Sequence, residues 1–271
     1  MFINDNGVTI SVPDGHSFTE EYRTRINQER YFRLISNYMI SSGYVRRNII
    51  DLGAWIGDNS IPWAMNLANG GGIVYSIDPS EYNCEYIGKV AEMNNISNIK
   101  IINHVISDGC KVVSTVDTDP RTDIYGGKMH HLTFSNDDSQ EIRLNAVSLD
   151  YLYEGGEIGD IDYIHLDVEF MERLVIEGSV KVIERYQPII AYEQHLDIDD
   201  YESLVKILNR RGYDVYIIDE RFNNYRYDYR NLIALPSRID SEQFKNEVES
   251  ELKVVDLLKR IVLDKEDGVI L

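Results

Sequence analysis

The chain has 271 residues, 43% of them hydrophobic, and carries a formal net charge of −19 at pH 7. This length and composition suit one large globular domain, or one domain with appendages, that buries a sizeable core. The acidic excess argues against a nucleic-acid partner or an anionic membrane surface, because phosphate binding relies on clustered lysine and arginine.

Signals of secretion, membrane insertion and cysteine-based structure are not found in the sequence. The segment Met1–Asp5 has no basic flank before an apolar core, and no apolar run approaches the roughly 18 residues of a membrane span. Cys84 and Cys110 have neither the spacing of metal ligands nor that of a disulfide framework. We therefore expect a cytoplasmic protein without membrane insertion.

Residues 1–47 are expected to form an arm and a helix that pack on the core. The first 16 residues suit a short strand or extended arm that ends at the turn formers Pro13-Asp14-Gly15. Ser17 can cap a helix that has acids in its first turn. Apolar residues then recur at helical spacing towards Ser42-Gly43, namely Tyr22, Ile26, Tyr31, Leu34, Ile35 and Tyr38. The pattern predicts one amphipathic helix beside the first strand of a sheet.

Residues 48–236 alternate between strand and helix patterns. Strands are expected at 48–51, 73–77, 100–104, 161–169, 188–195, 213–218 and 231–235. Helices are expected at 60–67, 81–93, 171–185 and 199–211. The alternation predicts a Rossmann-like α/β fold, with a mostly parallel, seven-stranded sheet, helices on both faces and a C-terminal antiparallel hairpin.

An insertion at residues 109–147 interrupts this alternation. Its first half is rich in turn formers and charges, and Ile142–Val147 suits a strand of a surface hairpin. Long excursions of this kind are usually functional or mobile. His130 and His131 lie in it, either in a solvated loop or in a lid that faces a substrate.

Residues 237–271 follow the predicted sheet and contain a helical pattern. Asp240 can cap a helix that runs to about Leu263. One apolar stripe extends along it, formed by Phe244, Val248, Leu252, Val255, Leu258 and Ile261. The stripe is expected to pack on the domain, and a homodimer contact is the alternative.

A glycine-containing turn follows the first predicted strand. Gly53 and Gly57 separate that strand from the helical pattern that begins near Ser60. Glycine at a strand-to-helix turn allows backbone conformations closed to other residues and lets a ligand approach closely. An ordinary turn, with glycines only for packing, is the alternative interpretation.

The second predicted strand ends in Asp78, where an acid typically binds the hydroxyls of a nucleoside ribose. The glycine turn lacks the G-x-G-x-x-G spacing that a dinucleotide requires, and Asp51 would repel a phosphate. A ligand with an ammonium or sulfonium group, such as S-adenosyl-L-methionine, fits better. A nucleotide-dependent oxidoreductase is accordingly disfavoured.

Several segments between Asn48 and Leu235 together resemble the FkbM family of class I, S-adenosylmethionine-dependent methyltransferases. The first is Ile50–Ser60, similar to the family's glycine motif followed by Gly-Asp-x-Ser. The second is Val74–Ser80, where the family more often has Glu-Pro than Asp78-Pro79. The remainder are Ala146–Asp150, Ile161–Glu169 and Pro188–His195, similar to the family's Leu-Asp, Asp-x-x-Lys-x-Asp-x-Glu-Gly and Pro-x-x-x-x-Glu-x-His.

The resemblance implies methylation of a hydroxyl group, on a sugar, a glycan or a similar small molecule. Two departures stand near the expected site: His165 replaces the usual Lys and Phe170 the usual Gly. We expect His165, with His130 and His131, to face the substrate. A non-sugar acceptor, or a catalytically silent binding module of the same fold, is the alternative.

The cofactor-binding residues are expected at the strand ends. Asp51, Gly53, Ala54 and Gly57 should line the methionine end, which Asn59 and Ser60 should contact from the helix start. Asp78 should hold the ribose, with Pro79 beside it. Ser107 and Asp108 follow the third strand, where adenine is commonly bounded.

A hydroxyl is a weak nucleophile at neutral pH, so a nearby base or metal should help methyl transfer. The candidates are Asp167 and Glu169 after the fourth strand, and Glu193 and His195 after the fifth. We expect Asp167 or His195 to take the proton and Glu193 to orient its partner. An Mg²⁺ or Mn²⁺ ion held by Asp167, Glu193 and His195 is one alternative, because such ions prefer carboxylate ligands. A purely structural role is the other.

Overall fold

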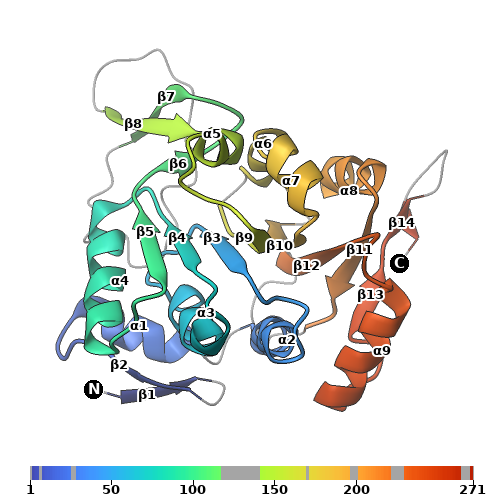
Figure 1. The fold of residues 1–271 in the computed structure, drawn as a ribbon, viewed down its shortest axis with the longest axis horizontal. Coiled ribbons are helices and arrows are strands. Elements are labelled where there is room, and N and C mark those ends of the chain that lie inside the picture. The colour runs from blue at the N-terminus through green and yellow to red at the C-terminus, as the bar shows by residue number, and fades with distance from the viewer. Residues whose placement is uncertain are drawn as a thin grey trace.

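A computed structural model describes residues 2–5, 8–25, 29–116, 141–168, 171–195, 201–220, 229–263 and 269–270. Its centre is an eight-stranded sheet in the order β13-β11-β12-β10-β9-β3-β4-β5 (Figure 1). The strands are β3 (Asn48–Leu52), β4 (Val74–Ile77), β5 (Ile99–Ile102), β9 (Ile161–Leu166), β10 (Ile189–His195), β11 (Tyr213–Ile218), β12 (Tyr229–Pro236) and β13 (Leu258–Arg260). The predicted α/β fold is confirmed.

The sheet is parallel across β5, β4, β3, β9 and β10. Strand β12 then pairs antiparallel with both β10 and β11, which gives the predicted C-terminal hairpin. The eighth strand, β13, pairs antiparallel with β11 and was not predicted. A helix was expected to extend through its residues.

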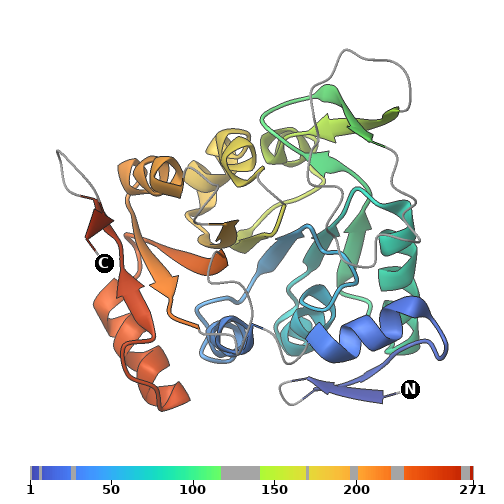
Figure 2. The same ribbon diagram turned by 180° about the vertical axis from the view of Figure 1, so that it is seen from behind.

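Helices cover both faces of the sheet (Figures 1 and 2). One layer contains α5 (Leu149–Glu154), α6 (Glu172–Glu177), α7 (Val180–Tyr186) and α8 (Tyr201–Arg210). The other contains α2 (Arg30–Ser41), α3 (Ser60–Leu67), the short 3-10 helix η1 (Ala68–Gly70), α4 (Glu81–Met93) and α9 (Ser241–Leu252).

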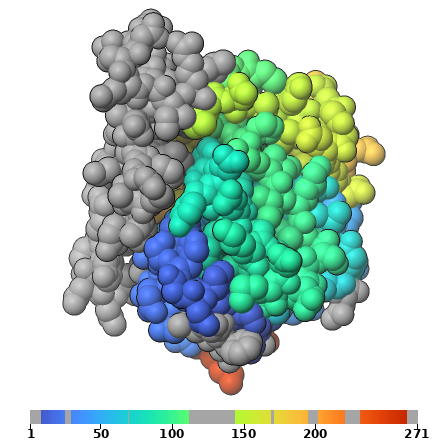
Figure 3. Space-filling view, turned by 90° about the vertical axis from the view of Figure 1, so that its left-hand side faces the viewer, coloured from blue at the N-terminus to red at the C-terminus, as the bar shows by residue number. Residues whose placement is uncertain are grey.

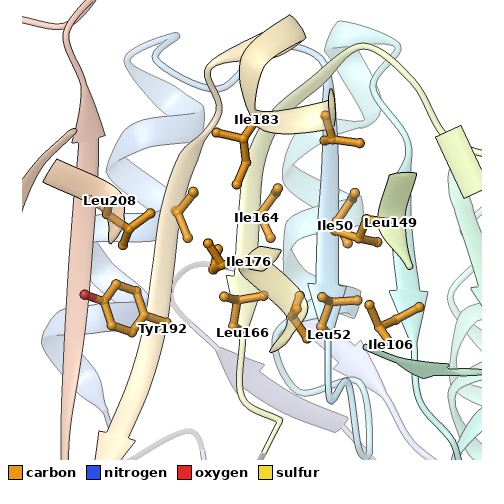
Figure 4. Close-up of a cluster of buried hydrophobic side chains, with 14 of the residues drawn as sticks. Ile50, Leu52, Ile106, Leu149, Ile164, Leu166, Ile176, Ile183, Tyr192 and Leu208 are labelled. Atoms are coloured by element: carbon orange, nitrogen blue, oxygen red, sulfur yellow. The ribbon is translucent and has the colours of Figure 1, made fainter. Parts of the chain in front are cut away.

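Because side chains alternate along a strand, each face of the sheet has its own core. Figure 4 shows Ile50 and Leu52 of β3 beside Ile164 and Leu166 of β9, under Ile183 of α7. The opposite face places Ile49 and Tyr163 against α2 and α3. Asp51 and His165 lie on this second face, because they are two residues further along the same strands.

The N-terminal segment forms a small hairpin and two helices. Strands β1 (Phe2–Asp5) and β2 (Val8–Ser11) precede α1 (Ser17–Arg25), which packs with α4 (Figure 3). The single helix that was expected over this region is wrong, because Glu29 adopts a left-handed conformation with φ of 50°. The Glu220 carboxylate accepts hydrogen bonds from the Tyr31 and Phe32 amides and caps the second helix.

The predicted insertion contributes two strands, β7 (Lys111–Val116) and β8 (Glu141–Val147), to a separate three-stranded sheet. The third strand of this sheet is β6 (Val105–Ile106). Strand β8 includes the strand predicted at Ile142–Val147. His130 and His131 lie outside the described residues, and so does the predicted lid.

Two further helix predictions need correction. The helix expected over residues 171–185 is divided at Gly178, where a Cβ atom would lie 2.1 Å from the Ser107 carbonyl oxygen. The C-terminal helix ends at Leu252, and Lys253 is left-handed with φ of 55°. Beyond it Val255 is 83% exposed, whereas Leu258 is fully buried in β13. Two short strands, β14 (Val262–Leu263) and β15 (Val269–Ile270), follow.

The helix α9 packs on the domain through Phe244 and Val248, in the same core as α2. This agrees with the packing expected for the first half of the stripe, and the homodimer stays a prediction. None of the helices in the described part of the chain is long and apolar enough to cross a membrane.

A buried ion pair joins α2 to the glycine turn. The Arg33 guanidinium donates to the Asp58 carboxylate and, over 2.8 Å, to the Asp58 carbonyl oxygen. The two side chains are only 3% and 5% exposed. Asp58 lies between Gly57 and the start of α3. The Arg33–Asp58 pair therefore holds the C-terminal end of the glycine turn against α2.

We expect Arg33→Met to lower the free energy of unfolding by about 3–5 kcal/mol, because it leaves the Asp58 charge buried without its cationic partner. Urea denaturation measures the change. Lys206→Met is the control, because Lys206 pairs with Glu202 at the surface, and it should cost less than about 1 kcal/mol. Equal effects of the two substitutions would show that the buried pair is unimportant.

Candidate functional site

The candidate site lies where the order of the strands reverses. From β3 the chain proceeds through β4 to β5 on one side, and it later returns to β9 and β10 on the other. Ligands of open α/β sheets bind beyond the carboxyl ends of the strands at such a point. Here the turn after β3 meets the segment after β9.

The turn after β3 has a strained and closely packed backbone. Gly53 and Gly57 both have φ of 74°, which glycine adopts readily. A Cβ atom on Gly53 would lie 1.8 Å from the Asp167 carbonyl oxygen, so only glycine fits there. Trp55 has φ of 46°, a conformation that costs a bulky residue on the order of 1–2 kcal/mol.

The Asp51 carboxylate connects four elements beneath this turn. Its Oδ1 accepts a hydrogen bond of 2.8 Å from His165 Nδ1 on β9. Its Oδ2 accepts from the hydroxyl of Ser60, the first residue of α3. The Ser60 hydroxyl is also 2.8 Å from Ser76 Oγ on β4. One carboxylate therefore fixes both ends of the turn.

His165 is enclosed by aromatic rings and acids. Its ring stacks on Phe32, with centroids 4.9 Å apart, and meets Trp63 edge-on at 5.5 Å. Burial by itself lowers the pKa of His165, but the hydrogen bond and charge of Asp51, with the charges of Asp167 and Glu29, outweigh it, so the pKa is raised.

These contacts give a structural role to three of the predicted site residues. Asp51, Ser60 and His165 are 1%, 0% and 3% exposed. Asp51 accepts hydrogen bonds from Ser60 and His165, and Ser60 also bonds Ser76. The three side chains therefore shape the turn, and their contacts with a cofactor or substrate stay predictions.

Asp78 lies at the end of β4, next to the turn. Its Oδ2 accepts from the Trp55 amide at 2.8 Å, and its Oδ1 accepts from the Ser80 amide and the Asn83 side chain. A carboxylate can accept about four hydrogen bonds, so Oδ2 can accept one more, at a residue that is 4% exposed. Burial, opposed by these hydrogen bonds and assisted by the Asp51 charge, raises the pKa of Asp78 to about 6.

The remaining turn residues fit a nucleoside ligand with a cationic tail. Asn59 is 7% exposed, and its Oδ1 is a buried acceptor without a hydrogen-bond partner. An ammonium group could satisfy it. Ala54 is buried, and its amide and carbonyl groups bond Ile77 and Gly57. A Cβ atom on Gly57 would lie 3.0 Å from the Ile87 side chain, and Pro79 is half-buried beside Asp78.

The predicted adenine boundary is only partly accessible. Ser107 is fully buried, and its hydroxyl donates to Asp108 Oδ1 at 3.0 Å. Asp108 is exposed and forms an ion pair with Lys111. Asp108 is thus the more accessible of the two, and the adenine contact stays a prediction for both.

Two predicted catalytic acids follow the ends of adjacent strands. Leu166 and Tyr192 are the last paired residues of β9 and β10, and Asp167 and Glu193 follow them directly in the chain. Both are half-buried. His195 ends β10, but its side chain, like Glu169, lies outside what the structure describes. In the described part of the chain no three His, Cys, Asp or Glu residues form a metal-binding group, so the Mg²⁺ or Mn²⁺ alternative gains no support.

Three contributors were missed by the sequence analysis. The Trp55 amide and the Asn83 side-chain amide donate hydrogen bonds to Asp78. Arg33 donates to the Asp58 carboxylate. A bulky residue between two glycines was a visible signal for Trp55. Arg33 had no local signal, because its partner lies 25 residues away.

The model of the methyltransferase FkbM domain matches residues 51–215. A structure of methyltransferase FkbM from Methylobacillus flagellatus KT is 17% identical, with a TM-score of 0.50, over 82% of this chain and 56% of that one. The present chain thus spans little more than half of that protein.

Other solved structures are less similar. Precorrin-6y C5,15-methyltransferase from Geobacter metallireducens GS-15 is 11% identical, with a TM-score of 0.43, over 83% of this chain and 94% of its own. A SAM-dependent methyltransferase from Aquifex aeolicus is 9% identical, with a TM-score of 0.41, over 79% and 96%. No curated protein sequence gives a significant match.

We expect Gly53→Ala to lower the free energy of unfolding by about 3 kcal/mol, because it adds both a clash and an unfavourable φ. Gly156→Ala is the matched control, since Gly156 has φ of 72° but nothing within 4 Å of a Cβ atom. The control should cost only about 1 kcal/mol. Thermal and urea unfolding measure both values, and equal losses would rule out the close approach to Asp167.

Proposed function

The chain belongs to the FkbM methyltransferase family, and we propose that it transfers a methyl group from S-adenosylmethionine to a hydroxyl oxygen of a glycan or similar small molecule. The use of S-adenosylmethionine follows from the family. The observation that carries the proposal is the arrangement at the switch point, where Asp78 is hydrogen-bonded to the glycine turn and Asp167 and Glu193 directly follow the last paired residues of the adjacent strands β9 and β10. A non-sugar acceptor is the alternative.

The cofactor would be held by residues of the turn and of β4. Asp78 Oδ2 would accept a hydrogen bond from a ribose hydroxyl, and Asn59 Oδ1 one from the ammonium group. The tight packing around Gly53 fixes the backbone that faces the ligand. When bound, S-adenosylmethionine supplies a methyl group on a positively charged sulfur.

The acceptor would lie beyond the ends of β9 and β10. Asp167 or His195 would take the proton of its hydroxyl, and Glu193 would orient the neighbouring group. A positioned base typically contributes 10²–10⁴-fold to the rate. Holding the acceptor oxygen in line with the methyl group contributes as well, because the reaction is a displacement.

Calorimetric titration with S-adenosylhomocysteine, followed by transfer of labelled methyl groups to a panel of glycans, tests the proposal. Asp167→Asn should leave binding of S-adenosylhomocysteine within about twofold of the wild type. If Asp167 is the base, the turnover should fall by the 10²–10⁴-fold typical of a lost base. Glu154→Gln, at an exposed acid of α5 that forms a surface ion pair with Lys181, is the control and should retain turnover.

Normal turnover of Asp167→Asn would move the base to His195, which His195→Ala then tests. Binding without transfer to any acceptor would indicate a silent module. Absence of binding would contradict the proposed function altogether.

The affinity for S-adenosylhomocysteine should fall about tenfold between pH 7.5 and pH 5. Asp78 has its pKa raised to about 6 in the unliganded protein, so it takes up a proton in this interval. A ribose hydroxyl forms a stronger hydrogen bond to the ionised carboxylate than to the protonated one, so protonation opposes binding. Calorimetry across this pH range measures the effect.

Asp78→Asn serves as the control for this pH dependence. It should bind at least tenfold more weakly at pH 7.5, and its affinity should change much less across the interval. An unchanged pH dependence in Asp78→Asn would assign the titration to another group.

A further inference from the structure

The candidate site contains a buried histidine, His165, surrounded by acidic side chains. His165 donates to Asp51 at 2.8 Å, and it also experiences the charges of Asp167 and Glu29. Asp78 in turn experiences the charge of Asp51. Because His165 lies against Asp51 in the buried interior, the charge of the side chain at position 165 sets the net charge of this pair.

The pair is held in place. His165 is 3% exposed and is enclosed by Phe32 and Trp63, so its ring does not turn away from Asp51. Asp51 precedes Gly53 by two residues, and Ser60 holds its other oxygen. Because water is excluded from this position, its charge acts on a nearby ligand with little screening.

We propose that His165 is a specificity-determining residue, which sets how strongly the site prefers cationic S-adenosylmethionine to neutral S-adenosylhomocysteine. The inference rests on the proposed use of this cofactor. The two ligands differ by one methyl group and one positive charge. A charge on the side chains of the Asp51–His165 pair therefore changes mainly the difference between their binding free energies. A permanent cation at position 165 weakens the preference, and a neutral side chain there strengthens it.

The test compares the dissociation constants of both ligands by calorimetry, without an acceptor. His165→Lys supplies a permanent cation, and His165→Gln supplies a neutral hydrogen-bond donor. The ratio of the constant for S-adenosylhomocysteine to that for S-adenosylmethionine should be about tenfold higher in His165→Gln than in His165→Lys, equal to about 1.4 kcal/mol. The wild-type ratio should lie between them or match one of them.

Tyr163→Phe is the matched control, because Tyr163 is buried two residues earlier on the same face of β9 and bonds Ser36 at 3.1 Å. It removes a buried polar group without changing charge, so it should leave the ratio unchanged. A merely structural role of His165 would shift both constants together and leave the ratio constant.

Asp51→Asn keeps the test informative if either His165 variant fails to fold. It removes the negative charge but retains the shape of the side chain, so the ratio should fall below the wild-type value. Equal ratios in His165→Lys and His165→Gln, or an unchanged ratio in Asp51→Asn, would overturn the inference alone. Binding of neither ligand to the wild type would overturn the proposed function and the inference together.

Discussion

The site depends on one buried carboxylate. Asp51 accepts hydrogen bonds from His165 on β9 and from Ser60 at the start of α3, and Ser60 lies against Ser76 on β4. Its two oxygens thereby join three adjacent strands and a helix at the point where the strand order reverses. The glycine turn is closed at both ends by this contact, so its conformation is set before a ligand arrives. Such preorganisation lowers the conformational entropy lost on binding.

The second contribution comes from the segment before the sheet. Helix α2 supplies Arg33 to the end of the turn and Phe32 to the face of His165, while Glu220 holds the start of the helix. The matched family domain begins only at residue 51. Helix α2 nevertheless supports the turn, so the site depends on residues that precede the matched range as well.

Much of the fold was predictable because it is encoded locally. Helices α3 and α4 match their predicted ranges, since glycines and a serine cap mark their ends. The C-terminal strand was not predictable, because Val255, Leu258 and Ile261 follow Leu252 at three-residue spacing, as in a helix. The buried roles of Asp51 and His165 also escaped prediction, because they depend on the pairing of strands 114 residues apart. The residue types of the site were predictable from the sequence. The directions of their side chains were not, because these depend on how β3 pairs with β9.

The strained residue Trp55 has an optical consequence. The chain contains two tryptophans, and they occupy opposite environments. Trp63 is 1% exposed in the core between α2 and the sheet, whereas Trp55 is half-buried on the glycine turn beside Phe18. Fluorescence emission from Trp63 reports unfolding of the core, and emission from Trp55 reports changes in the environment of the glycine turn. With Trp63 replaced by phenylalanine, the intrinsic fluorescence of the protein becomes a label-free signal from the candidate site itself.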